Sequence, residues 1–471
     1  MGAATPAVGT VGAGVPPLHA TRTPARSPTA TERMLRGPIA PTLLRMAAPN
    51  VIGLFAFTFM TGFDGWLVGR LGNDALAGVA IVLPLSMLML QMSAGSLGGS
   101  TTAAVARALG SGQPAQAAAL ARHAVLLGLA ASLAFTLVGV HGFVFEAMGA
   151  RGGVLEQAGR YAGVLFAGAA AIWTQNVLAG VARGAGEMRA TAVALVGTAA
   201  MHLLLAPRLV FGAGPIPALG VAGAAASTVL CNALSSLAML AWLSRRGSAL
   251  DLMGGRWRFE SATARPILAV ALPSAMNPIL SNASIAFATV AMGSFGHLAV
   301  AAYGIAARLE YILVPIVFGM GSALTAIVAA NMGARQGARA KRVAWTGAGF
   351  VWVVTGLIGA WAAVWPGAWM SLFTADPAVR SAGAAYLRIA GVSYGFYGLA
   401  LALFFASQGA GRMAWPILGS ALRFLVVAVG GWLALKVGGS APTALHAVIA
   451  LSLGVMGIGL AAATWAADWE R

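Results

Sequence analysis

A few ionisable side chains lie inside long apolar stretches of this 471-residue chain, where they need a chemical reason. Asp64 is the clearest case, because no other charged residue lies between Arg45 and Arg70. That gap corresponds to about 36 Å of helix, and Asp64 lies about 9 Å before its end. Removing a carboxylate from water favours its protonated form, so Asp64 can exchange protons as its surroundings change. We expect Asp64 to couple a cation to a conformational change. A structural aspartate that caps a helix or pairs with an arginine is the alternative.

Other ionisable residues within apolar stretches suggest weaker hypotheses. His202 has the side chain best suited to relay protons near neutral pH, although a buried histidine is more often a packing residue. Arg308 and Glu310 are two residues apart, so they do not share a helix face and each needs a partner on another helix. They either take part in coupling or stabilise their half. Arg388 and Arg423 could bind an anionic group, but internal pairing is the expected role.

The composition predicts an all-α integral membrane protein. Apolar residues make up 59% of the chain and charged residues only 9%, whereas a soluble domain carries about 25% charge. The single cysteine, Cys231, excludes a disulfide framework and a cysteine-built metal site. The net charge of +17 resides mostly in short loops. It indicates topology rather than nucleic-acid binding, and it favours two cytoplasmic termini.

The hydrophobic stretches are long enough to cross a bilayer twelve times. The expected spans are 41–68, 75–105, 122–145, 158–182, 190–211, 219–243, 266–292, 299–330, 344–366, 381–406, 415–436 and 443–466. The organisation follows as a disordered cytoplasmic tail (1–38), a first lobe of six helices (39–243), a cytoplasmic linker (244–265), a second lobe of six helices (266–466) and a cytoplasmic C-terminus (467–471).

The two lobes repeat each other at a distance of about 224 residues. The matching segments are 68–80 with 292–304, Leu109-Gly110 with Met332-Gly333, 183–188 with 408–413, and Pro49 with Pro273. Since each half has an even number of spans, both halves start on the same side and form parallel repeats. Asp64 corresponds to Ala288 in the second half, so the fold itself does not require an acid there. Substrate is expected to bind between the lobes.

Polar, aromatic and methionine side chains within the spans are candidates for lining a cavity, since flexible methionines and flat rings suit bulky apolar cations. The candidates are Phe57, Met60, Phe63, Gln175, Asn176, Asn282 and Tyr394. We find no phosphate-binding loop, metal-ligand spacing or nucleophile elbow, so we expect neither an enzyme nor a cofactor or metal.

Several motifs in both halves resemble the MATE (multidrug and toxic compound extrusion) family across about residues 40–465. They are Phe-Asp-Gly-Trp-Leu-Val-Gly-Arg-Leu-Gly at 63–72, Ala-Ala-Tyr-Gly-Ile-Ala-Ala-Arg-Leu-Glu at 301–310, Phe-Thr-Ala-Asp-Pro at 373–377 and Gln-Gly-Ala-Gly-Arg at 408–412. The resemblance implies twelve helices in two pseudo-symmetric six-helix lobes. It also implies efflux of bulky cationic compounds in exchange for H+ or Na+.

The resemblance also bears on the coupling residues. Asp64 falls on the first-helix acid of the DinF-like branch, while Ser281 occupies the position where the NorM-like branch places a glutamate. DinF-like members carry Asn and Asp before a proline in the fifth span, where this chain has His202 and Ala206 before Pro207. The missing carboxylate disfavours Na+, which prefers several oxygen ligands, and a histidine beside Asp64 suits protons.

We therefore expect a secondary active antiporter that exports apolar or cationic compounds in exchange for H+, with Asp64 and His202 as coupling residues. Na+-coupled drug efflux and a flippase for a lipid-linked precursor are the alternatives. The expected partners are small drug-like molecules, H+ (or Na+) and the lipid bilayer, with no nucleic acid. The expected state is a monomer in the bacterial plasma (inner) membrane.

Overall fold

Helices form all the regular structure in the residues that the computed structural model describes, which are 2, 29–215, 217–245, 250–254, 257–437 and 442–470. The first half contains α2 (Ile39–Gly69), α3 (Asn73–Leu90), the π-helix η1 (Gln91–Leu97), α4 (Gly98–Gly110), α5 (Pro114–Gly139), α6 (Phe143–Ala147), α7 (Gly152–Ala167), α8 (Ala169–Gly184), α9 (Met188–Phe211) and α10 (Val221–Leu243).

The second half repeats this order. It contains α11 (Ser261–Gly293), α12 (His297–Gly333), α13 (Gly337–Val364), α14 (Pro366–Met370), α15 (Pro377–Ala390), the short 3-10 helix η2 (Gly391–Ser393), α16 (Tyr394–Ala410), α17 (Ala414–Leu425), the π-helix η3 (Val426–Gly430), α18 (Gly431–Val437) and α19 (Thr443–Ala466).

The number and placement of the long helices confirm the predicted membrane architecture. Eleven helical stretches among the described residues are long and apolar enough to cross a bilayer, and α7 with α8 forms a twelfth that bends by 48°. Each expected span coincides with one of them; α5 ends at Gly139, six residues before its predicted end, whereas most other helices extend a few residues beyond the predicted ends. For example, α11 begins at Ser261, inside the segment predicted as linker.

The predicted disordered tail contains a short ordered helix, which we did not expect. Helix α1 (Ala30–Arg36) begins with a capping box in which Thr29 and Glu32 satisfy each other's backbone N–H groups. Met34 is fully buried, and its carbonyl accepts a hydrogen bond of 3.1 Å from the Asn331 side chain of α12. Tail residues 1 and 3–28 lie outside the described residues.

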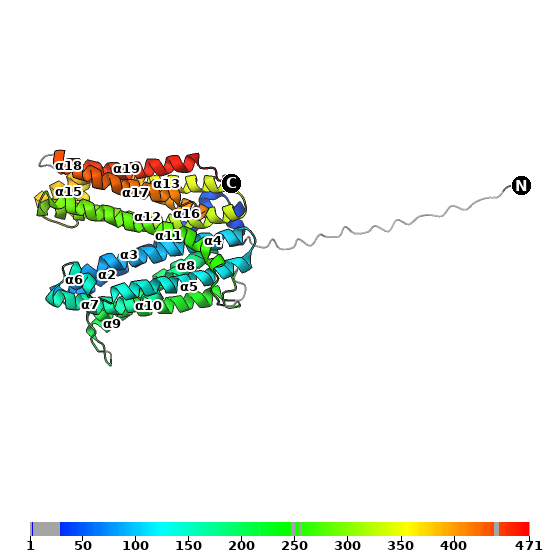
Figure 1. Cartoon of the computed structure of the whole chain (residues 1–471), viewed down its shortest axis with the longest axis horizontal. Coiled ribbons are helices and arrows are strands. Elements are labelled where there is room, and N and C mark those ends of the chain that lie inside the picture. The colour runs from blue at the N-terminus through cyan, green and yellow to red at the C-terminus, as the bar shows by residue number, and fades with distance from the viewer. Residues whose placement is uncertain are drawn as a thin grey trace.

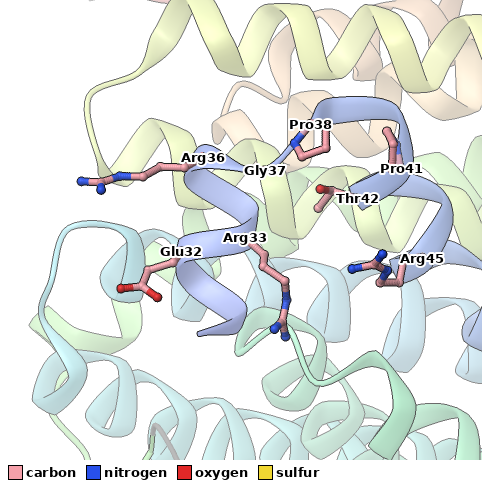
Figure 2. Close-up of a pocket in the computed structure, with 8 residues that line it drawn as sticks. All are labelled: Glu32, Arg33, Arg36, Gly37, Pro38, Pro41, Thr42 and Arg45. Atoms are coloured by element: carbon pink, nitrogen blue, oxygen red, sulfur yellow. The ribbon is translucent and has the colours of Figure 1, made fainter. Parts of the chain in front are cut away.

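A surface cavity of about 510 Å³ lies between α1 and the start of α2 (Figure 2). Three of its lining side chains are arginines, Arg33, Arg36 and Arg45. It lies at the end of the bundle where Figure 1 shows the first, blue helix close to the C-terminus. The cavity therefore presents mainly positive charge at this end of the bundle.

The two halves meet tightly where α4 crosses α12. A Cβ atom on Gly110 would overlap the carbonyl oxygen of Ala330, and a Cβ atom on Gly333 would overlap that of Arg107. These two contacts are equivalent under the sequence repeat, so the crossing is reciprocal and depends on a glycine from each half. Toward the opposite end, where α6 and α15 lie, the ribbons of the two halves diverge (Figure 1).

Candidate functional site

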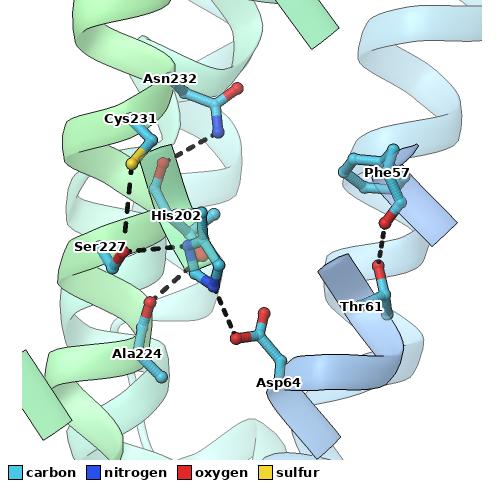
Figure 3. A network of polar contacts seen from close by, with 9 residues as sticks. Phe57, Thr61, Asp64, His202, Ala224, Ser227, Cys231 and Asn232 are labelled. Carbon is cyan, nitrogen blue, oxygen red and sulfur yellow. Dashed lines mark hydrogen bonds and ion pairs between the residues drawn. The ribbon is translucent and has the colours of Figure 1, made fainter. Parts of the chain in front are cut away.

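Asp64 and His202 lie in direct contact in the first half (Figure 3). The Nε2 atom of His202 in α9 is 2.7 Å from Oδ1 of Asp64 in α2. The other ring nitrogen, Nδ1, is 3.0 Å from the Ser227 hydroxyl in α10. Cys231 follows one turn later, with its sulfur 4.0 Å from that hydroxyl. The structure therefore joins both predicted coupling residues in one polar chain across three helices.

Burial differs along this chain in a way that suits proton exchange. The His202 side chain is fully buried, whereas that of Asp64 is 21% exposed. Ser227 is also fully buried. An ionised carboxylate only accepts hydrogen bonds, so Nε2 of His202 carries the proton in this contact whenever Asp64 is ionised. The Ser227 hydroxyl can donate to a bare Nδ1 or accept from a protonated one, and it therefore tolerates both charge states of the ring.

The surroundings of Asp64 do not resemble a metal site. Across the described ranges between residues 29 and 470, no group of three or more His, Cys, Asp or Glu side chains is arranged to hold a metal ion. Ala206, which replaces the second acid expected from the family resemblance, is fully buried and provides no ligand. Hard cations prefer several oxygen ligands, and the Asp64 carboxylate is bonded to an imidazole rather than placed beside a second acid.

Arg308 and Glu310 point to different partners, as their spacing predicted. Glu310 is buried and accepts a hydrogen bond of 2.8 Å from the Tyr386 hydroxyl in α15. Arg308 is exposed, and its guanidinium carbon lies 5.4 Å from the ring centroid of Phe373. Arg423 is buried and lies 5.0 Å from the centroid of the Tyr397 ring. Glu310 and Arg423 belong to the interior of the second half, while Arg388 is exposed.

The residues predicted to line a cavity are not gathered at one surface. Phe57 and Phe63 are half-buried on α2, and Asn176 donates a hydrogen bond of 2.8 Å to Ser93 of η1. Asn282 is exposed and donates to the carbonyl of Pro278 in its own helix.

The expectation that Tyr394 lines an open cavity is wrong for this conformation. Tyr394 is fully buried among the side chains of the second half, and Met60 and Gln175 are also almost fully covered. A helix inside a membrane bundle is apolar on its lipid face, its packed face and its cavity face alike. The sequence therefore did not distinguish a packed tyrosine from one that lines a cavity.

Sequence reasoning missed a group of polar contacts between the halves at their closed end. The Asn50 side chain of α2 donates a 2.7 Å hydrogen bond to Ser322 of α12. Gln408 of α16 donates a hydrogen bond of 3.0 Å to the carbonyl of Gly95 in η1. Arg107 donates one of 2.9 Å to the carbonyl of Gly409. The repeat alignment contained a signal for these contacts, because it places polar residues, Arg183 and Gln408, at equivalent positions near the ends of apolar spans. The structure shows that both side chains are buried.

Two six-span halves that meet at one end and diverge at the other define the class of this protein. It is a polytopic membrane protein built from parallel repeats, the architecture of transporters that move one half against the other.

Comparison with known proteins identifies the family. The MatE family model matches residues 49–207 and 273–433, once in each half, so the chain belongs to the MatE family of membrane transporters. The FAD transporter of Shewanella oneidensis is 29% identical over 388 residues, which cover 78% of this chain and 82% of that protein. The probable multidrug resistance protein NorM of Deinococcus radiodurans is 28% identical, with 82% and 86% covered.

Solved structures confirm the fold. A MOP superfamily transporter from Pyrococcus furiosus superposes with a TM-score of 0.85 at 24% identity, with 93% of this chain and 97% of that chain covered. An outward-facing multidrug resistance transporter of the MATE family superposes with a TM-score of 0.84 at 24% identity, with 92% and 96% covered.

Proposed function

We propose that this protein is a secondary active efflux antiporter in which protons bind at Asp64 and His202. The observation that carries the proposal is the chain from Asp64 through His202 to Ser227, which is buried at one end and reaches the surface of α2 at the other. A buried ionisable residue in a membrane span is costly and indicates function by default. The equivalent position in the second half is Ala288, so the fold itself does not require an acid at this position.

The proton site and the interface between the halves share one helix. Asp64 lies on α2, and Asn50, about four turns earlier on the same helix, bonds to Ser322 of the other half. Val51 is packed against Gly319 of α12. A proton that changes the contact of Asp64 with α9 therefore acts on a helix that also holds the interface. This arrangement supports coupling of proton binding to movement of the halves.

Protons rather than Na+ are the proposed coupling ion, because Asp64 is paired with a titratable ring and not with a second carboxylate. The same residues support placement in the DinF-like branch. The excess of arginine at the end that carries α1 supports cytoplasmic termini, and the bacterial plasma membrane is the proposed location. In this orientation the structure is closed toward the cytoplasm. A monomer is the proposed state.

Drug-like compounds are the first candidate substrates, since several similar proteins are multidrug resistance proteins. A second candidate is FAD or a related anion, which the similarity to the FAD transporter favours. The expected role of Glu310 is stabilisation of the second half, because the carboxyl group is enclosed there with Tyr386. The half-buried Phe57 and Phe63 remain the proposed contacts for an apolar substrate.

The test is transport by purified protein in liposomes with an imposed pH gradient. Wild type should exchange ethidium or FAD for protons, and Asp64→Asn should lose gradient-driven transport while it retains exchange of substrate without a gradient. Since Asn keeps the shape of Asp, this variant removes only the titratable group. Transport that survives the substitution, or that responds to Na+ and not to pH, would contradict the proposal.

A further inference from the structure

Arg183 is a buried cation at the closed interface between the halves. It lies at the end of α8 and is only 5% exposed. Its guanidinium carbon is 5.8 Å from the ring centroid of Phe318, which belongs to α12 of the other half. On the side of its own half, a Cβ atom built on Gly98 would lie 3.3 Å from Nη2 of Arg183. The guanidinium therefore lies between α4 and α12.

This guanidinium has no anionic partner in the part of the chain that the structure describes. Its Nη2 atom is buried without a hydrogen-bond acceptor, and none of the ion pairs in the described ranges includes Arg183. An arginine removed from water without a carboxylate or phosphate carries a large desolvation cost. Such a cost is tolerated when the group gains an anionic partner in another state of the protein.

The repeat shows that the fold does not require this charge. Gln408 occupies the equivalent position in the second half and is also fully buried at the interface. Its neutral side chain reaches across to Gly95 and bonds to Ser274 at 3.2 Å. A neutral residue thus occupies the same packing position, and its Oε1 atom, like Nη2 of Arg183, is buried without a hydrogen-bond partner among the described residues. Arg183 is therefore charged where its equivalent in the second half is neutral, and the same holds for Asp64 and Ala288.

Opening of this end would expose Arg183 to a substrate from the same side of the membrane. The contacts that would break are those of Gln408 with Gly95 and of Arg107 with the Gly409 carbonyl. Arg107 lies more than two turns after Gly98 on α4, closer to the end of that helix. It would therefore become a second free guanidinium along the same path.

We infer that Arg183 binds an anionic group of the transported substrate when the halves open at this end, and that the substrate class includes organic phosphates. The planar guanidinium pairs with two oxygens of a phosphate at once, which fits phosphate better than a cationic drug. The inference rests on the proposed transport function, and it specifies the substrate. Closure of the halves around the bound anion would place the charge pair out of water.

The test compares FAD with riboflavin, which has the same isoalloxazine ring but lacks the two phosphates and the adenosine of FAD. Equilibrium binding to the purified protein, without a gradient, should show a preference for FAD of about tenfold or more, the range expected for a charged hydrogen bond. Arg183→Gln should remove this preference while binding of riboflavin and ethidium changes little. Arg183→Lys, which keeps the charge and loses the paired donors, should show an intermediate preference.

A matched control and a second measurement keep the test decisive. Arg189→Gln removes the same charge from an exposed position beside the same loop and should leave the FAD preference intact. In the wild type, pyrophosphate should displace FAD and leave ethidium bound, a measurement that needs no variant. Equal weakening of FAD and riboflavin in Arg183→Gln would show a packing role and overturn the inference. No preference for FAD in the wild type would overturn it as well.

These outcomes are separate from the test of proton coupling. Binding at equilibrium does not depend on a gradient, so a failure of Asp64→Asn to abolish driven transport would leave the result for Arg183 unchanged. Conversely, a protein that binds FAD and riboflavin equally could still exchange another substrate for protons.

Discussion

His202 and Asp64 are joined by a 2.7 Å contact that links α9 to α2, the helix that also bonds to the second half through Asn50. The histidine is enclosed on its far side by Ser227, whereas the aspartate is partly exposed. Protons can therefore reach the pair from the side of Asp64. Because the two groups share one hydrogen bond, a proton gained or lost by either of them changes the contact that links α9 to α2.

His202→Gln is expected to make the pH dependence of substrate binding shallower. The glutamine amide can still donate to Asp64, but it cannot take up a proton, so the pair loses one titrating group. The measurement is the dissociation constant for ethidium or FAD across pH 5 to 9. A slope of log Kd against pH that is unchanged from wild type would show that His202 stays in one charge state throughout the cycle.

Ser227→Ala is expected to lower the free energy of unfolding by about 1–3 kcal/mol, because it removes the hydrogen bond between Ser227 and the buried Nδ1 of His202. Ser235→Ala is the matched control. Ser235 lies on the same helix and is also buried, but its hydroxyl has no hydrogen-bond partner among the described residues. Thermal unfolding in detergent measures both. Equal effects would mean that Ser227 contributes packing alone.

The helices and the Asp64–His202 pair were predictable because both leave marks in the sequence. Long apolar stretches between arginine-rich loops define spans, and a charge inside such a stretch is conspicuous. The bend between α7 and α8 at Gly168 left no comparable mark. The same applies to the π-helices η1 and η3, because extra turns of this kind depend on packing against neighbours rather than on residue type.

The partners of the predicted site could not be predicted. Ser227 and Cys231 face His202 from α10, yet serine and cysteine occur on any face of a membrane helix. Helix α1 was missed because its seven residues lie in a region rich in Pro, Gly and Ala. Its stability comes from the burial of Met34 against residues about 300 positions away, which no local pattern reveals.

Tyr386→Phe is expected to destabilise the second half by about 1–3 kcal/mol, because it removes the hydrogen bond to the buried Glu310. Glu310→Gln provides the comparison, since its amide oxygen can still accept a hydrogen bond from the Tyr386 hydroxyl. Thermal unfolding should separate the two variants, while gradient-driven transport should persist in both. Loss of coupling in Glu310→Gln would instead assign Glu310 to the proton pathway.

Gly110→Ala and Gly333→Ala are each expected to open the interface at the end that carries both termini. The added methyl group would overlap a backbone carbonyl oxygen of the other half, and backbone cannot move aside as a side chain can. Because the two contacts are reciprocal, either substitution should have the same effect. Transport of both ethidium and FAD should fall, because the transport cycle needs the state in which α4 and α12 close this end.

The measurement is the distance between spin labels on cysteines introduced at the exposed Ser111 and Arg335, one in each half. The native Cys231 is fully buried and can remain. The distance distribution should shift to longer values in both variants. Gly349→Ala is the control, because Gly349 lies within α13 with open space around its Cβ position. If the distances in Gly110→Ala and Gly333→Ala match those in Gly349→Ala, the crossing of α4 and α12 does not control closure.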